Sequence, residues 1–187
     1  RGECYEKDLS VKEVVLVKNH SGFYPGRGHL IDLLIENNVK VKAVFTPEHG
    51  LRGILPAGES YGDESYRGIP VYSLYGPRRK PPVSVLKGLN AVIYSIQDVG
   101  VRFYTYISTL YYTLEAAGEA GVKVIVLDNP NPLTGVVVEG PILEPGLRSF
   151  VGIWSIPIRY GLTAGELATL YNNEAVLRDE VEAIKLD

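Results

Sequence analysis

The 187-residue sequence has no methionine, a single cysteine (Cys4), one tryptophan and no long apolar run. A lone cysteine excludes an internal disulfide and a zinc cluster built from cysteines. No apolar stretch approaches the roughly 20 residues that a membrane-spanning helix needs, and no charged start followed by an apolar core marks a signal peptide. Because the chain begins at Arg1 and lacks methionine, we expect a processed or truncated N-terminus. The compartment therefore stays open between the cytoplasm and export with a signal removed.

The sequence also lacks an excess of positive charge. With 19 Lys and Arg against 22 Asp and Glu the net charge is −3, which argues against a nucleic-acid partner. The densest basic stretch is Arg78 to Lys80, and the flanking Pro77 and Pro81 favour a solvated turn over a phosphate site. A hydrophobic fraction of 45% and a charged fraction of 22% are typical of a globular protein, and the length suits one domain.

What the sequence does contain is five short apolar runs, each followed by a polar cluster. The runs are rich in Val and Ile and apolar at both odd and even positions, as in strands covered on both faces. They lie at residues 14–17, 42–45, 71–74, 91–96 and 124–127. Helical or turn-rich stretches separate them, so we predict an α/β fold with a mostly parallel sheet and flanking helices. Ligands bind beyond the carboxyl ends of such strands, where all five clusters fall.

Four helices and one long loop are predicted between and after these strands, and one of these helices is a short one within residues 81–88. A short amphipathic helix is expected at residues 29–37, and an irregular stretch at 50–68. The strongest helix is expected at 102–121, with a buried stripe of Phe103, Ile107, Leu110, Leu114 and Ala117. Thr163 and Glu166 form a capping box at the start of the last helix, so Glu166 is predicted to be a cap rather than a catalyst. The apolar pieces between 129 and 162 are expected to be edge strands or covering loops.

Three carboxylates follow predicted strands and are candidates for acid–base chemistry. Glu48, Asp98 and Asp128 stand at strand ends, and Glu48 is next to His49 and a glycine. One carboxyl in an apolar setting can stay protonated and donate to a leaving group, while another stays ionised and stabilises positive charge or activates water. For Asp98 and Asp128 the sequence taken alone favours a structural role, in which they cap the following turn or helix.

The sequence gives no support for a metal or a nucleotide cofactor. His20, His29 and His49 match no standard metal-ligand spacing. Gly26 and Gly28 form only a fragment of a dinucleotide-binding fingerprint, and no GKS or GKT phosphate loop is present. We therefore expect no cofactor, and a nucleotide-binding protein of the same fold class is the weaker alternative.

Several motifs together resemble one enzyme family. They include TPEHGLRG at 46–53, IQDVGVRFYTYIST at 96–109, LDNPNP at 127–132 and LTAGELA at 162–168. In this order they are similar to the motifs of the NamZ-type exo-β-N-acetylmuramidases, and the resemblance covers nearly the whole chain. It implies an enzyme that releases N-acetylmuramic acid from the non-reducing end of peptidoglycan fragments. It also implies a Rossmann-like domain over residues 1–187, followed by a C-terminal domain that is absent from this chain, with the active site between the two.

The resemblance makes Glu48 the favoured catalytic residue, as general acid, and we expect Asp98 to be the second catalytic carboxyl. The residues expected to bind the sugar are Asn19, His49, Arg52, Gln97, Arg102, Tyr104, Tyr106 and Asp128. Among them Arg102, at the predicted start of the long helix, is expected to bind the lactyl carboxylate of muramic acid. The chain departs from the family pattern at Asn129 and Tyr160, where an arginine and a histidine are expected. A non-catalytic glycan-binding domain is the alternative function, and retention, inversion and assistance by the substrate's acetamido group all stay open.

Overall fold

A computed structural model describes residues 12–21, 23–24, 28–51, 53 and 64–177. Its main sheet has six strands in the order β5-β6-β4-β1-β7-β8. In chain order these are β1 (Glu13–Lys18), β4 (Lys40–Thr46), β5 (Glu64–Tyr66), β6 (Ile69–Ser73), β7 (Ala91–Ser95) and β8 (Lys123–Val126). A separate antiparallel pair is formed by β2 (Phe23–Tyr24) and β3 (Gly28–His29).

All five predicted strands are present, and they pair in parallel. Numbered along the chain, these five strands lie in the order 3-2-1-4-5, which is the Rossmann-like arrangement. The prediction of an irregular stretch at 50–68 is wrong at its end, where β5 pairs antiparallel with β6. This three-residue edge strand is mostly exposed and lacks the apolar alternation that would reveal it in the sequence.

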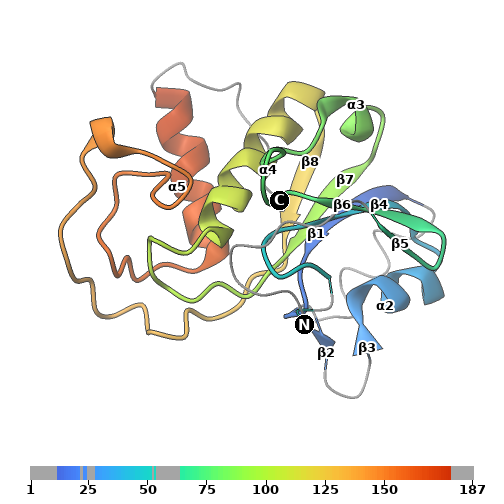
Figure 1. Ribbon diagram of the computed structural model, residues 1–187, viewed down its shortest axis with the longest axis horizontal. Coiled ribbons are helices and arrows are strands. Elements are labelled where there is room, and N and C mark those ends of the chain that lie inside the picture. Colours follow the sequence, from blue (N-terminus) through green and yellow to red (C-terminus); the bar gives the residue numbers. More distant parts are fainter. Residues whose placement is uncertain (1–11, 22, 25–27, 52, 54–63, 178–187) are drawn as a thin grey trace.

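Helices cover both faces of the sheet (Figure 1). The helix α2 (Leu30–Glu36) packs on one face, against a core that includes Val14 and Leu16 of β1. On the other face, α3 (Val83–Leu86), α4 (Tyr106–Ala120) and α5 (Ala164–Leu177) share a core with Val15 and Val17. Because successive residues of a strand point to opposite faces, β1 is buried throughout and supplies both cores. No described helix is long and apolar enough to cross a membrane.

The long helix α4 begins four residues later than predicted. Val101 forms an isolated bridge with Arg159, and the Arg102 N–H donates to the Ile158 carbonyl at 2.8 Å. The chain then passes through turns and a bend over residues 102–105 before the helix begins. As a result Phe103 is 55% exposed and does not belong to the buried stripe. The other four predicted stripe residues are buried, and the helix ends at Gly121 in the left-handed conformation that glycine favours.

The predicted capping box at the start of α5 is confirmed. The Thr163 N–H donates to Glu166 Oε2 at 2.8 Å, and the Glu166 N–H donates to Thr163 Oγ1 at 3.2 Å. Asp128, which follows β8, adds a second cap by accepting hydrogen bonds from Thr163 Oγ1 at 2.6 Å and from the Gly165 N–H at 2.9 Å. A Cβ at Gly165 would lie 2.7 Å from the Asp128 carboxylate, so this close approach requires glycine.

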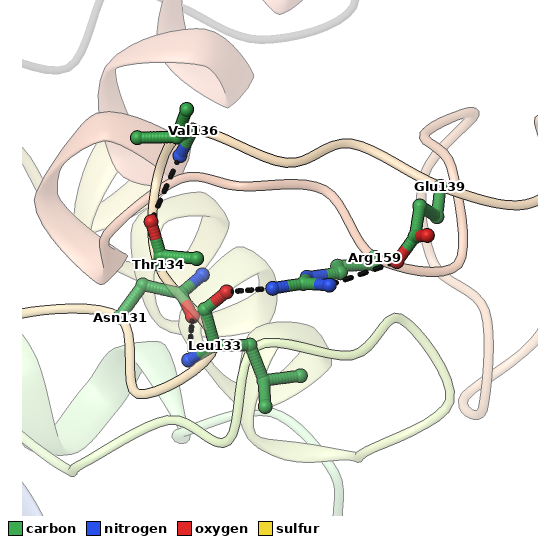
Figure 2. A network of polar contacts seen from close by, with 6 residues as sticks. All are labelled: Asn131, Leu133, Thr134, Val136, Glu139 and Arg159. Carbon is green, nitrogen blue, oxygen red and sulfur yellow. Dashed lines mark hydrogen bonds and ion pairs between the residues drawn. The ribbon is translucent and has the colours of Figure 1, made fainter.

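The segment from 129 to 162 is a covering loop without a named strand. It includes the short 3-10 helix η1 (Pro145–Leu147) and runs along the outer side of α4 and α5 in Figure 1. Figure 2 shows how Arg159 ties this segment together: its guanidinium donates to Glu139 Oε2 at 2.8 Å and to the Leu133 carbonyl. Nearby, Asn131 Oδ1 accepts the Leu133 N–H at 2.8 Å. Side-chain contacts and isolated backbone bridges, such as the one between Glu139 and Arg159, thus replace a strand ladder in this part of the chain.

We predict that Asp128→Ala destabilises the protein by about 1 kcal/mol, because the first turn of α5 loses two acceptors, as in other N-cap deletions. Urea unfolding followed by circular dichroism measures the change. Asp128→Asn, which keeps an acceptor oxygen, should lose less. The neighbouring Asn129→Ala is the matched control, and equal losses in Asp128→Ala and Asn129→Ala would contradict the capping role.

Candidate functional site

The candidate site lies at the common carboxyl edge of β1, β4 and β7, where Tyr106 meets residues from all three strand ends. Tyr106 is the first residue of α4 and is buried. The amide of Asn19 lies close enough to the Tyr106 hydroxyl to affect its pKa, although Asn19 Nδ2 makes no hydrogen bond within the described part of the chain. The charges of Glu48 and Asp98 also act on this hydroxyl. The Tyr104 ring lies 5.9 Å from the Tyr106 ring in an edge-on arrangement. The structure therefore brings together five of the predicted site residues.

The pKa of Tyr106 is raised above its usual value, mainly by burial. The Asn19 contact lowers this pKa because it stabilises the phenolate, and the negative charges of Glu48 and Asp98 raise it. Tyr106 therefore keeps its proton across the physiological range. Its hydroxyl can act there as a hydrogen-bond donor to a ligand oxygen.

Asn19 is held in place by a short loop that links the ends of two strands. Its side chain is fully buried, and its Oδ1 accepts hydrogen bonds from the Ser21 N–H at 2.9 Å and from Ser21 Oγ at 2.6 Å. Ser21 Oγ in turn accepts the Gln97 N–H at 2.9 Å. Gln97 Nε2 donates to the carbonyls of Asp98 at 2.9 Å and Pro130 at 3.2 Å. Asn19 and Gln97 thus position the β1 and β7 ends relative to each other.

Glu48 lies half-buried in a tight turn directly after β4. His49 and Gly50 both have positive φ angles, 70° and 68°, which is uncommon for a residue other than glycine. Tyr75 lies just after β6, and its hydroxyl hydrogen-bonds to the Glu48 carboxylate. Burial raises the pKa of Tyr75, and the Glu48 charge and hydrogen bond raise it further. Tyr75 stood in one of the five polar clusters, but nothing in the sequence indicated that it contacts Glu48.

His49 lies beside a second imidazole at the same edge. The rings of His20 and His49 are 6.5 Å apart and nearly perpendicular. Gly53 packs against His20 so closely that an added Cβ would lie 2.6 Å from the ring. The pKa of His20 is lowered by burial, then by His49 and Lys18, so the imidazole is neutral at physiological pH. The described residues contain no group of three or more His, Cys, Asp or Glu arranged to hold a metal ion.

Lys18, at the end of β1, is a buried cation beneath this edge. Its side chain is fully buried and its Nζ lies 3.5 Å from His29 Nδ1. Burial lowers the pKa of Lys18 to about 8, and the charge of Asp32 opposes this shift. Asp32 itself binds Arg67 Nε at 3.1 Å and the Tyr66 hydroxyl at 3.1 Å. Lys18 is therefore enclosed in a polar cluster rather than directed toward a ligand.

Asp98 is held more rigidly than Glu48. Its Oδ2 accepts the Gly100 N–H at 2.8 Å and the Tyr160 hydroxyl. Burial raises the pKa of Asp98, while hydrogen bonds from the Gly100 and Val99 backbone oppose the shift. Its Oδ1 is buried, with no hydrogen-bond partner among the described residues. Tyr160, where the resemblance led us to expect a histidine, is thus a direct partner of the second candidate carboxyl.

Of three other predicted site residues, Arg102 lies differently from the prediction, Asp128 has the capping role that the sequence also indicated, and Arg52 is not described. Arg102 precedes α4 by four residues and is not at its start, and its Nη1 donates to the carbonyls of Pro141 at 2.7 Å and Ile156 at 2.5 Å. The carboxylate of Asp128 caps α5. Arg52 lies outside the described residues.

A small pocket opens beside Asp98, between the ends of β7 and β8 and the start of α5. It is lined by Ile96, Gln97, Asp98, Asn129, Pro130, Asn131, Leu162, Thr163 and Ala164. The wider edge thus combines two carboxylates in different settings with hydroxyl and amide donors. Such a set can bind a polyhydroxylated ligand and move a proton at a glycosidic oxygen.

Comparison with known proteins finds one family and several relatives. The family model described as exo-beta-N-acetylmuramidase NamZ, N-terminal, matches residues 14–187. The chain is 46% identical to the peptidoglycan beta-N-acetylmuramidase NamZ of Bacillus subtilis (strain 168), over 97% of this chain and 45% of that protein. The chain therefore spans less than half the length of this relative.

Two crystal structures of DUF1343 family proteins from Bacteroides fragilis NCTC 9343 share the fold. One has a TM-score of 0.85 and 43% identity, covering 99% of this chain and 46% of that one. The other has a TM-score of 0.83 and 37% identity, covering 100% of this chain and 49% of that one. These similarities confirm the predicted α/β fold over the whole aligned length.

We predict that Asp98→Asn flattens the pH dependence of stability in the acidic range. The folded-state pKa of Asp98 lies above its ordinary value of 3.8. At a pH between these two pKa values, unfolding therefore releases a proton from Asp98. The contribution of Asp98 to stability is therefore fully present below pH 3.8 and is lost as pH rises through the folded pKa. The pH dependence of stability is measured by the urea midpoints of unfolding of the wild type and the variant from pH 3 to pH 7. A wild-type contribution that grows with pH over this range would contradict the assignment.

Proposed function

The chain belongs to the family of exo-β-N-acetylmuramidase NamZ N-terminal domains, and on that basis we propose that it carries the catalytic edge of a glycosidase that releases N-acetylmuramic acid from the non-reducing end of peptidoglycan fragments. The observation that carries this proposal is that Glu48 and Asp98, which follow β4 and β7, both lie close enough to Tyr106 for their charges to raise its pKa. The Bacillus subtilis relative, whose name states this kind of activity, supports the choice of sugar.

Glu48 is the proposed general acid. It lies half-buried in a turn at the mouth of the site, next to the Tyr75 hydroxyl, and can give its proton to the oxygen of the leaving group. As the glycosidic bond breaks, positive charge develops on the anomeric carbon and ring oxygen. If the acetamido oxygen attacks first, the carboxylate that remains on Glu48 takes a proton from the water that then opens the cyclic intermediate. If water attacks directly from the opposite face, its proton passes to the second carboxyl, Asp98.

Asp98 is the proposed second carboxyl, and it acts by charge. Three donors hold it and it is nearly buried, so it can stabilise developing positive charge without moving. This leaves the attack on the anomeric carbon to a water molecule or to the acetamido oxygen of the substrate. The anomer that forms first, observed by NMR, distinguishes them: inversion indicates water, and retention indicates the acetamido group.

A glycan-binding domain without catalytic activity is the second candidate function. It is favoured by the enclosure of Asp98, since a buried carboxylate whose Oδ2 is held by hydrogen bonds can serve in binding alone. Turnover of a chromogenic β-N-acetylmuramide decides between the two. Binding without release of the chromophore by the complete protein supports a binding domain and overturns the hydrolase.

We predict that Glu48→Gln lowers kcat by about 10²–10⁴-fold while KM changes little, because the amide keeps the shape of the carboxyl but has no proton to give. Steady-state kinetics on a natural disaccharide and on an activated aryl glycoside measure this. The aryl glycoside should be affected less, since its leaving group needs less protonation.

Glu144→Gln is the matched control, because Glu144 is an exposed carboxyl in the covering loop. It should leave both kinetic constants unchanged. A Glu48→Gln variant with near-normal kcat on the disaccharide would move the acid role away from Glu48, and Asp98→Asn would then be the next variant to assay.

We further propose that the complete protein has a C-terminal domain that forms the other wall of the site. The relatives that match over 97% or more of this chain are about twice as long. The covering loop also exposes several apolar side chains, with Val136 at 88% and Ile142 at 64% exposure. Clustered apolar exposure of this kind is typical of surfaces that another domain covers.

We therefore predict that the 187-residue chain alone folds but turns over an N-acetylmuramide on the order of 100-fold more slowly than the complete protein, because substrate positioning by the second wall is lost. Circular dichroism checks that the isolated chain is folded, and kcat/KM is compared at equal molar concentration. Equal activity of the two proteins would place the entire site on the edge described above.

A further inference from the structure

The basic tract from Arg78 to Lys80 is a loop, as predicted, but its side chains are held by specific contacts. Arg78 lies over the Tyr72 ring at 5.4 Å. Lys80 binds Glu115 at 2.6 Å and Glu119 at 2.7 Å, which fastens the loop to α4. Between them, Arg79 lies with its guanidinium carbon 4.7 Å from the centre of the Phe150 ring. The tract is therefore anchored on both sides of Arg79.

Phe150, on which Arg79 lies, is itself fixed to α4. Its carbonyl accepts a hydrogen bond from Ser108 Oγ at 2.7 Å, and its ring stacks on Tyr112 with 6.2 Å between centres and an angle of 21°. A cation over an aromatic face is attracted by the ring's negative centre while its N–H groups stay directed outward. Arg79 is thus held in place although its side chain is exposed.

This arrangement lies next to the proposed acid. The Tyr75 and Phe150 rings are 6.5 Å apart, and the Tyr75 hydroxyl hydrogen-bonds to Glu48. Arg79 is close enough to Tyr75 that its charge lowers the pKa of that hydroxyl. A continuous set of contacts therefore leads from Arg79 through Phe150 and Tyr75 to Glu48.

Other described cations near the site are already engaged. Arg102 donates to two carbonyls, and Lys18 is enclosed beside His29. Arg159 binds Glu139 and the Leu133 carbonyl. Arg79 has neither a carboxylate nor a carbonyl partner among the described residues, so its guanidinium fork can still take two oxygens.

We propose that Arg79, held on Phe150 beside Tyr75 and Glu48, binds the carboxylate of an acidic sugar and so sets the preference for the lactyl group of muramic acid. The proposal rests on the proposed function for its substrate, and it assigns to Arg79 the role that the sequence suggested for Arg102. A planar guanidinium binds a carboxylate through two parallel hydrogen bonds. A neutral group in place of the carboxylate does not form the same charged pair with the guanidinium.

The test compares two substrates with the same leaving group in the complete protein: a chromogenic β-N-acetylmuramide, and the same compound with its lactyl carboxylate converted to the methyl amide. Arg79→Met should lower kcat/KM for the acid about 10-fold or more, mainly through KM, and leave the amide nearly unchanged. Arg79→Lys should recover part of the loss. Arg78→Met is the matched control, since it removes a neighbouring charge that lies on a different ring.

Equal losses on both substrates, no loss at all, or the same loss in Arg78→Met would overturn the proposal. Calorimetry with free N-acetylmuramic acid gives a readout that does not depend on hydrolysis. If the wild type binds this acid but cleaves no muramide, and Arg79→Met abolishes the binding, the role of Arg79 is supported and the proposed hydrolase activity is overturned. A wild type that neither binds the acid nor cleaves the muramide overturns both.

Discussion

The parallel pairing of β1 with both β4 and β7 is the constraint on which the rest of the molecule depends. It places β1 at the centre of the sheet, where Val15 and Val17 face α4 and α5 while Val14 and Leu16 face α2, all fully buried. A polar side chain in the middle of such a strand would be buried without a hydrogen-bond partner, which is unfavourable. The polar side chains therefore lie at the end of the strand. Because parallel strands end at the same edge, Asn19, which follows β1, lies close to residues that follow β4 and β7.

The same constraint explains why much of the fold could be predicted from the sequence. A strand buried on both faces must be apolar at consecutive positions, and that signal is local, so all five parallel strands were found. The capping box at Thr163 and Glu166 is likewise a local signal, because the two residues satisfy each other's backbone donors within one turn. The start of α4 was misplaced since it depends on pairing with residues near 159, which lie more than 50 positions away.

The candidate site could be predicted as a region but not as a set of contacts. Strand-end positions indicated Glu48 and Asp98, yet their partners Tyr75 and Tyr160 lie 27 and 62 positions further along the chain. No spacing rule links residues so far apart; only the folded sheet and the covering loop bring them together. Arg102 shows the reverse case, because its position in a motif suggested a ligand whereas its guanidinium holds the loop carbonyls.

The two carboxyls at the edge occupy different physical settings, and acid–base chemistry depends on such a difference. Asp98 is nearly buried, held by Gly100 and Tyr160, and its raised pKa reflects the cost of removing its charge from water. Glu48 is half-buried in a turn, and a tyrosine hydroxyl that can rotate contacts it. A proton donor must reach the leaving oxygen and later accept a proton again, so it needs access and some freedom to move. A group that stabilises charge needs neither, because preorganised charge acts best when it does not reorient. The proposed division of roles therefore follows from where β4 and β7 end: β4 leads into the half-buried turn that holds Glu48, and β7 leads into a segment that packs against α5 and the covering loop.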